Sequence, residues 1–224
     1  MSYISLKNVS KEYKVNNEIF KALDDVSIDI ESGEFVIILG TSGSGKSTLL
    51  NIIGGMDKHS KGSVIIDDLS LDGMSNKSLS KYRKDYVGFI FQSYNLIGNL
   101  TAVENVMLSN NNITYDMALD ALKKLDVDSK ASMFPSNISG GEAQRVSIAR
   151  AIVKKPRLLL CDEPKGALDT KNGDLVMEYL SKMCKEMGQT VIAVTHNPDY
   201  VKYATKLIRL RDGKIESGDS NGNS

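Results

Sequence analysis

The chain has 224 residues, of which 41% are hydrophobic and 25% are charged, enough for one domain with a sizeable core. Its 28 basic residues balance its 28 acidic residues, so no overall positive field favours binding to nucleic acid or to an anionic membrane surface. The longest apolar runs, such as FVIIL, are far shorter than the roughly 20 residues that span a bilayer. Cys161 and Cys184 lie in apolar stretches without metal-ligand spacing, so we expect reduced core thiols in a cytosolic chain.

The first ninety residues predict strands with one helix among them. Residues 3–9, YISLKNV, and 21–30, KALDDVSIDI, alternate apolar and polar positions, which is typical of half-buried antiparallel strands. Residues 35–40, FVIILG, form a continuous apolar run followed by glycines and a helical pattern, which indicates the start of an α/β core. Residues 62–67, GSVIID, and 86–92, YVGFIFQ, predict further strands.

Residues 93 to about 155 have helical apolar spacing, as in EAQRVSIARAIVKK, and predict an inserted helical lobe. After this lobe, residues 157–164 and 190–196 predict buried strands on either side of a helix over 175–187, the alternation of a mostly parallel sheet. LIRLRDGKIES predicts a hairpin with Asp212-Gly213 at its turn. We expect a single domain over residues 1–218 and a polar tail over 219–224.

The glycine-rich stretch GTSGSGKS matches G-x-x-x-x-G-K-[ST] between a predicted strand and a predicted helix. In that context backbone N–H groups surround a β-phosphate, Lys46 reaches the β and γ oxygens, and the Ser47 hydroxyl binds Mg²⁺. The alternative is an ordinary glycine-rich turn. We expect ATP and Mg²⁺ as ligands, with nucleotide contacts from Gly40, Thr41, Ser42, Gly43, Ser44, Gly45, Lys46, Ser47 and Thr48.

Two carboxylates follow the buried run LLLC, where they are costly unless they meet a metal or a proton-transfer partner. Asp162 fits the Mg²⁺-binding aspartate of a P-loop ATPase, and Glu163 is then the candidate that orients and polarises the attacking water. The alternative is a helix-capping pair at the end of the strand.

Three single residues are weaker candidates. Gln92 closes a predicted strand, where its amide can contact Mg²⁺ or water. His196 follows another strand and can hold the γ-phosphate or the water by hydrogen bonding, although a lone histidine there is more often structural. Tyr13 can stack on adenine, although an isolated surface tyrosine usually only packs.

The stretch SGGE opens a predicted helix with two glycines, although each glycine weakens a helix by about 1 kcal/mol. Ser139 and Glu142 have the spacing of a capping box, which does not explain the glycines. A glycine pair at a helix start lets an anion approach unpaired amides and the positive end of the helix dipole. We therefore expect Ser139, Gly140, Gly141 and Glu142 to contact phosphate, as a second site besides the P-loop.

The order of GTSGSGKST, FIFQSYNL, ISGGEAQR, LLLCDEP, ALD and VTH resembles the ATP-binding-cassette (ABC) ATPases over essentially the whole chain except the tail. The resemblance implies a head-to-tail homodimer in which the SGGE signature of one chain closes on the γ-phosphate held by the other. It also implies that Tyr13 is the adenine-stacking aromatic, Gln92 the Q-loop residue and His196 the switch histidine. Residues 167–169 would form the D-loop at the dimer seam.

The stretches IIGGMDKHSKG, VGFIFQSYNLIGNLTAVENV and EPKGALDT resemble the bacterial macrolide-export, lipoprotein-release and antimicrobial-peptide-resistance group. This implies a separate transmembrane permease, a place on the cytoplasmic face of the membrane, and mechanotransmission to the outer parts of the permease. Tyr94, Leu96, Ile97 and Leu100 fall where such a subunit grips a coupling helix, with core packing as the alternative. A cell-division-type subunit that regulates cell-wall hydrolysis without transport remains the alternative function.

The chain departs from the pattern of the group at two places. Lys165 stands where threonine is usual, which either tunes closure or has no effect, and the signature is I-S-G-G-E rather than L-S-G-G-Q. Neither change removes a catalytic group, so we expect activity to survive.

Two further classes of ATP-binding protein fit the sequence poorly. A DNA-repair ATPase would have a long coiled coil between Ser47 and Ser139, where this chain has no sustained heptads, and a nucleotide kinase has no use for ISGGEAQR.

Overall fold

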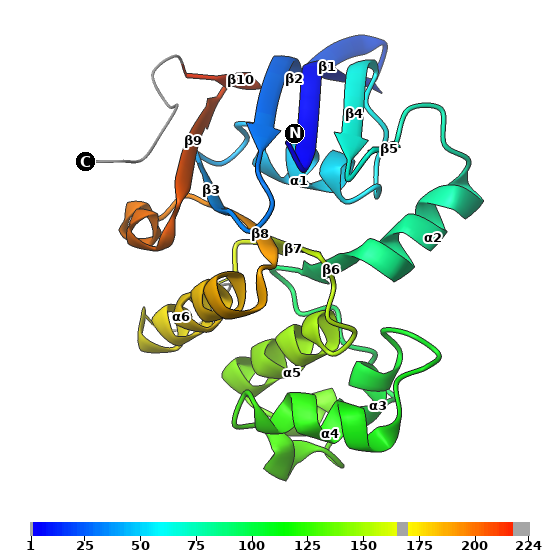
Figure 1. The fold of residues 1–224 in the computed structure, drawn as a ribbon, viewed down its shortest axis with the longest axis vertical. Coiled ribbons are helices and arrows are strands. Elements are labelled where there is room, and N and C mark those ends of the chain that lie inside the picture. Colours follow the sequence, from blue (N-terminus) through cyan, green and yellow to red (C-terminus); the bar gives the residue numbers. More distant parts are fainter. Residues whose placement is uncertain (1, 165–169, 217–224) are drawn as a thin grey trace.

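Two β-sheets and a helical lobe make up the fold of the computed structural model, which describes residues 2–164 and 170–216. In Figure 1 the antiparallel sheet lies at one end of the molecule, the helical lobe lies at the other, and the parallel sheet lies between them. The predictions for Lys165, for the D-loop residues 167–169 and for the tail 219–224 lie outside the described residues.

The antiparallel sheet has the strand order β2-β1-β4-β5. Its strands are β1 (Ile4–Val15), β2 (Glu18–Ile30), β4 (Lys61–Ile66) and β5 (Leu69–Ser70). Asn16 and Asn17 join β1 to β2 with φ angles of 47° and 69°, the left-handed pair that a tight hairpin requires. The predicted strand GSVIID is β4, and it pairs antiparallel with β1, so it belongs to this sheet and not to the parallel core.

The second sheet has the strand order β10-β9-β3-β8-β7-β6. Its strands are β3 (Phe35–Leu39), β6 (Val87–Ile90), β7 (Leu158–Asp162), β8 (Thr190–Thr195), β9 (Lys206–Arg211) and β10 (Lys214–Ile215). All neighbours pair in parallel except β9 and β10, which form the predicted hairpin with Asp212 and Gly213 at its turn. This confirms the predicted mostly parallel sheet.

The helices fall into two groups. α1 (Lys46–Ile53), α2 (Asn76–Tyr86) and α6 (Thr170–Met187) accompany the sheets, and the helical lobe contains α3 (Ala102–Met107), α4 (Tyr115–Lys123) and α5 (Gly140–Ile152). Short 3-10 helices cover Asp128–Lys130, Pro135–Asn137 and Pro198–Tyr203. No sequence pattern predicted α2. Within the described ranges, no helix combines the length and the apolar character that a bilayer crossing requires.

The parallel sheet separates two hydrophobic cores because successive side chains of a strand point to opposite faces. In β3, Phe35 and Ile37 pack toward the helical lobe and α6, whereas Val36 and Ile38 pack toward α1 and the antiparallel sheet. Strands β7 and β8 divide their side chains in the same way. Both cysteines are buried and free, as predicted for core thiols. The double burial explains the continuous apolar runs in these strands.

Candidate functional site

The carboxyl ends of three parallel strands meet at one edge of the sheet. Register pairs Leu39 of β3 with Thr195 of β8, and Asp162 of β7 with Val194 of β8. The loops that follow these strands line one cleft of about 780 Å³. Its lining residues are Tyr13, Phe20, Ala22, Thr41, Ser42, Gly43, Gly45, Lys46, Ser47, Thr48, Gln92, Asp162, Glu163 and His196. The structure therefore brings together the predicted P-loop, the carboxylate pair, and the glutamine, histidine and tyrosine candidates.

The P-loop packs closely against the backbones of β2 and β9, which leaves no room for a side chain at two of its glycine positions. A Cβ atom at Gly40 would collide with the backbone oxygen of Leu210, and one at Gly45 would collide with that of Ala22. Gly45 also has a φ of 101°, a conformation that other residues rarely adopt. Gly40 and Ser44, two of the predicted nucleotide contacts, do not line the cleft, and Ser44 is buried.

Lys46 is 7% exposed, and its ammonium folds back onto its own loop. Its Nζ donates to the carbonyl oxygens of Gly40 at 2.9 Å and Thr41 at 2.8 Å. Among the described residues no carboxylate pairs with it, so its charge is available to an anionic ligand in the cleft. The Gly45 N-cap of α1 provides no side-chain hydrogen bond, which leaves the helix N-terminus open to phosphate.

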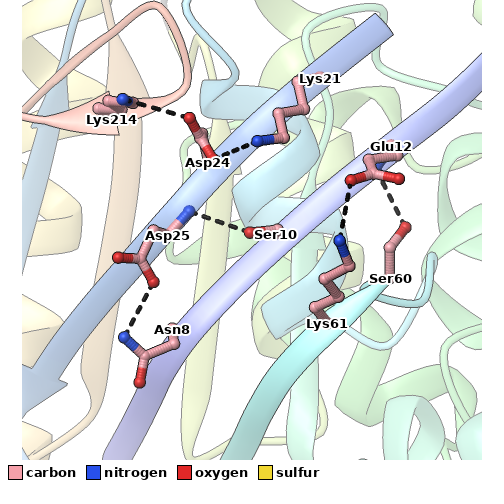
Figure 2. A network of polar contacts seen from close by, with 9 residues as sticks. All are labelled: Asn8, Ser10, Glu12, Lys21, Asp24, Asp25, Ser60, Lys61 and Lys214. Atoms are coloured by element: carbon pink, nitrogen blue, oxygen red, sulfur yellow. Dashed lines mark hydrogen bonds and ion pairs between the residues drawn. The ribbon is translucent and has the colours of Figure 1, made fainter. Parts of the chain in front are cut away.

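A polar network joins β2 to the β9–β10 hairpin, and Figure 2 shows Asp24 between Lys21 and Lys214. Asp24 accepts a hydrogen bond from Lys21 at 2.7 Å and forms an ion pair with Lys214 at 3.2 Å, and these contacts hold the pKa of Asp24 below its usual value. The backbone N–H of Asp24 donates to Gly213, whose own N–H donates to the carbonyl of Ser44 at 3.0 Å. The hairpin turn thus connects β2 to the P-loop.

The predicted metal ligands lie on neighbouring elements. The Ser47 hydroxyl donates to Oδ1 of Asp162 at 3.1 Å, and Gln92 lines the same cleft. Burial raises the pKa of Asp162, partly opposed by the Ser47 hydrogen bond, and the charge of Glu163 raises it further. The described residues contain no cluster of three His, Cys, Asp or Glu side chains. A hydroxyl, a carboxylate and an amide nevertheless supply the oxygen donors that Mg²⁺ prefers, so this set fits the ion.

Glu163 is held by two neighbours at the end of β8. Its Oε1 lies 2.9 Å from Nδ1 of His196, and its Oε2 accepts a hydrogen bond from the Thr195 hydroxyl at 3.2 Å. The side chain of Glu163 is 17% exposed, whereas that of His196 is 73% exposed. Glu163 has a φ of 45°, the left-handed backbone that is concentrated at functional sites. Thr195 was missed by the sequence analysis, because a threonine that ends a buried strand carries no signal of its own.

Two aromatic side chains face each other across the β1–β2 hairpin. Tyr13 pairs with Phe20 in the strand register, and both line the cleft. The Tyr13 hydroxyl donates to Asp57 at 2.7 Å, and Nζ of Lys11 lies 4.7 Å from the ring centroid. Phe20 is 57% exposed and was not predicted as a site residue. Its place opposite Tyr13 in the hairpin is the signal that would have found it.

The signature residues lie on the helical lobe and do not line this cleft. The predicted capping box is present. The Ser139 N–H and hydroxyl donate to Oε2 of Glu142 at 2.7 and 2.8 Å, and the Glu142 N–H donates back to the Ser139 hydroxyl at 3.3 Å. The two hydrogen bonds that the Glu142 carboxylate accepts from Ser139 lower the pKa of Glu142. One chain therefore keeps Ser139, Gly140, Gly141 and Glu142 apart from its own P-loop.

The ABC transporter family model matches residues 23–166, a segment that begins in β2, includes the P-loop and the signature, and ends three residues after Glu163. The chain belongs to the ABC transporter family. The ABC ATPase is 44% identical over 223 residues to the ABC transporter ATP-binding protein MJ0796 of Methanocaldococcus jannaschii, with 95% of each chain covered. It is 42% identical over 220 residues to the macrolide export ATP-binding/permease protein MacB of Campylobacter jejuni. That match covers 96% of this chain and 34% of MacB.

The fold of the ABC ATPase matches that of a dimeric structure of the cassette MJ0796, in a post-hydrolysis state bound to ADP and Pi. The TM-score is 0.92 at 40% sequence identity, and the match covers 99% of both chains. These comparisons confirm the predicted fold class, a P-loop α/β core with an antiparallel β lobe and an inserted helical lobe. They also confirm the predicted class of enzyme, an ABC-type ATPase.

Proposed function

We propose that two copies of this ABC ATPase bind ATP between them, head to tail, and use its hydrolysis to drive a separate membrane permease. The observation that carries the proposal is the separation of two phosphate-binding elements within one chain. The P-loop lines the cleft with Asp162 and Glu163, whereas the Ser139-Gly140-Gly141 turn lies on another lobe. A second copy supplies the missing turn to each cleft. The dimeric MJ0796 structure bound to ADP and Pi supports this arrangement.

Each cleft has residues for the separate tasks of hydrolysis. Lys46 exchanges its bonds to the loop carbonyls for bonds to the β- and γ-phosphates, because charge-assisted contacts to phosphate are stronger. Mg²⁺, held by Ser47, Gln92 and Asp162, would neutralise charge on the phosphate oxygens. Glu163 orients the attacking water and accepts its proton on a carboxylate oxygen.

The remaining predicted residues complete the site together with Thr195 and Phe20, which the sequence did not predict. Thr195 fixes the Glu163 carboxylate, and the exposed His196 side chain can turn from Glu163 toward the γ-phosphate. Tyr13 of β1 and Phe20 of β2, which also line the cleft, supply aromatic surface for the adenine base. From the partner, Ser139 and the two signature glycines contact the γ-phosphate, and Glu142 keeps their turn in place through the capping box.

The loop before α3 is the proposed contact with the permease at the cytoplasmic face of the membrane. Ile97 is 45% exposed on this loop, whereas Leu96 packs against the core of the helical lobe. The fully buried Asn105 holds the loop. Its Oδ1 accepts from the N–H of Ile97 at 2.7 Å, and its Nδ2 donates to three carbonyl oxygens between residues 97 and 101. Asn105 was missed by the sequence analysis, because its partners are backbone atoms.

Co-purification from membranes tests the proposal. The tagged chain should retain a transmembrane protein, and Ile97→Glu should lose it because a carboxylate would enter an apolar contact. Met187→Glu, at the end of α6 with 52% exposure, is the matched control and should retain the partner. Recovery of no membrane protein with the native chain contradicts the proposal. A partner that controls cell-wall hydrolysis and moves no substrate would favour the cell-division-type alternative.

A further inference from the structure

Arg150, in the last turn of α5, is hydrogen-bonded to the loop that follows Gln92. Its Nη1 donates to the carbonyl oxygen of Asn95 at 2.6 Å, and its Nη2 donates to that of Tyr94 at 2.7 Å. Both loop residues have left-handed backbones, with φ of 49° and 58°, so this is a defined turn. Burial lowers the pKa of Arg150. Within residues 2–164 and 170–216 no carboxylate pairs with it, so the guanidinium serves the loop alone.

The same loop also reaches the other end of α5. A Cβ atom at Gly140 would lie only 3.1 Å from the hydroxyl oxygen of Tyr94, so the bare backbone of this glycine leaves room for the tyrosine. Tyr94 thus contacts the last turn of α5 through its carbonyl and lies beside the first turn through its hydroxyl. This gives Gly140 a local structural role in addition to its proposed contact with phosphate.

A second bond connects α5 to the loop of Glu163. Nε2 of Gln144 donates to the carbonyl of Pro164 at 2.9 Å, and Gln144 is fully buried. Pro164 directly follows Glu163 in the chain. Helix α5 is therefore hydrogen-bonded to both loops that carry the proposed catalytic groups Gln92 and Glu163, and its own first turn is the signature.

We propose that Arg150 is a positioning residue that fixes the loop after Gln92 to α5, so that nucleotide in a chain's own cleft acts on the signature turn of the same chain. The inference rests on the proposed nucleotide site. A shift of Gln92 toward a bound nucleotide moves residues 94 and 95, and Arg150 transmits that shift to α5. Because α5 is one continuous helix of 13 residues, its first turn moves with its last.

Lys154 provides a matched control on the same segment. Its Nζ also donates to two consecutive carbonyl oxygens, those of Arg83 at 2.9 Å and Lys84 at 2.8 Å. It therefore resembles Arg150 in charge and in the number of hydrogen bonds to backbone atoms. The residues that it binds lie in the last turn of α2, however, and not in the loop after Gln92. If Arg150 had only a structural role, Arg150→Met and Lys154→Met should have similar effects on amide exchange in residues 139–143 and on kcat.

Backbone amide exchange in residues 139–143 tests the inference, measured with and without MgADP at a dilution where light scattering reports a monomer. The native chain and Lys154→Met should show exchange that slows severalfold with MgADP. Arg150→Met should bind MgADP with unchanged affinity but show no such slowing. In steady-state hydrolysis, Arg150→Met should lose kcat by about tenfold at constant KM. Arg150→Lys, which keeps the cation without the two-pronged geometry, should be intermediate and serves if Arg150→Met does not fold.

The outcomes separate this inference from the function on which it rests. If the native chain binds MgADP and residues 139–143 show no change, or if Arg150→Met shows the native change, the inference alone is wrong. Equal loss of kcat in Arg150→Met and Lys154→Met would also overturn it. If the native chain binds no MgADP, the proposed nucleotide site is wrong and the inference is overturned with it.

Discussion

Nδ1 of His196 lies 2.9 Å from Oε1 of Glu163, across the ends of the neighbouring strands β8 and β7. The pair joins a well-covered carboxylate to a histidine that is mostly in solvent. Thr195 donates to the other carboxylate oxygen, so Glu163 would keep this hydrogen bond if His196 turned toward the γ-phosphate as proposed. This arrangement suits the proposed roles, in which Glu163 accepts a proton from the attacking water and His196 contacts the γ-phosphate.

Glu163→Gln should keep ATP binding and lower the rate of hydrolysis by about 10²–10⁴-fold, because the amide cannot accept the proton of the water. ATP should then hold the two chains together, and size-exclusion chromatography should show a dimer that native protein loses as it turns over. Asp199→Asn is a control, since this exposed carboxylate lies outside the cleft. Turnover of Glu163→Gln at the native rate would remove Glu163 from the role of base.

Lys46→Ala should weaken MgATP binding by about tenfold or more, because it removes the buried cation that is proposed to bind the phosphates. Calorimetric titration with MgATP measures the loss. Lys58→Ala is the control, because Lys58 lies just beyond α1 and does not line the cleft. Unchanged affinity in Lys46→Ala would contradict the phosphate assignment of the P-loop.

Gly141→Asp tests whether the signature acts on the partner. The new carboxylate would repel the γ-phosphate while still suiting a helix start, so we expect the variant to fold and its homodimer to lose hydrolysis. A mixture with Lys46→Ala should then recover activity, because a mixed dimer pairs the intact P-loop of one chain with the intact signature of the other. We expect up to about a quarter of the native rate, since about half of the dimers are mixed and each has one complete site.

Lys46→Ala alone and Gly141→Asp alone, at the same total concentration, are the controls for this complementation. If the signature acted within its own chain, every chain in the mixture would carry one defect in its only site. No recovery on mixing, at concentrations where the native chain dimerises with ATP, would therefore contradict the head-to-tail arrangement.

Asp162→Asn should raise the stability of the nucleotide-free protein at pH 7 and abolish Mg²⁺-dependent hydrolysis. Burial raises the pKa of Asp162 in the folded state, so between the unfolded and folded pKa values the folded chain binds more protons than the unfolded chain. The contribution of Asp162 therefore becomes more stabilising as the pH falls toward the unfolded value. We expect a gain of at most about 1 kcal/mol in the variant, because the carboxylate is partly solvated.

Urea unfolding of native and Asp162→Asn protein between pH 4 and 7 measures this effect. The difference in the free energy of unfolding should shrink as the pH falls, since protonation removes the buried charge that the substitution removes permanently. A difference that grows toward acid would show that the Asp162 carboxylate is stabilised in the folded chain.

The sequence by itself determined the features that depend on neighbouring residues. The P-loop needs glycines, a lysine and a serine in fixed order between a strand and a helix, and such a motif keeps its meaning in any fold that supplies that context. The Ser139–Glu142 capping box and the Asp212-Gly213 hairpin turn are equally local, and the structure shows both. Continuous apolar runs predicted the strands that are buried on both faces.

Only the tertiary structure decided which distant segments meet. It placed β4 in the antiparallel sheet, put Phe20 beside Tyr13 in the cleft, and joined Arg150 to the loop after Gln92. A strand pattern does not specify its partner strand, and an arginine on a helix looks the same whether it faces water or a carbonyl. Such contacts arise from the packing of elements that are far apart in the chain, so their energy and geometry have no local signature in the sequence.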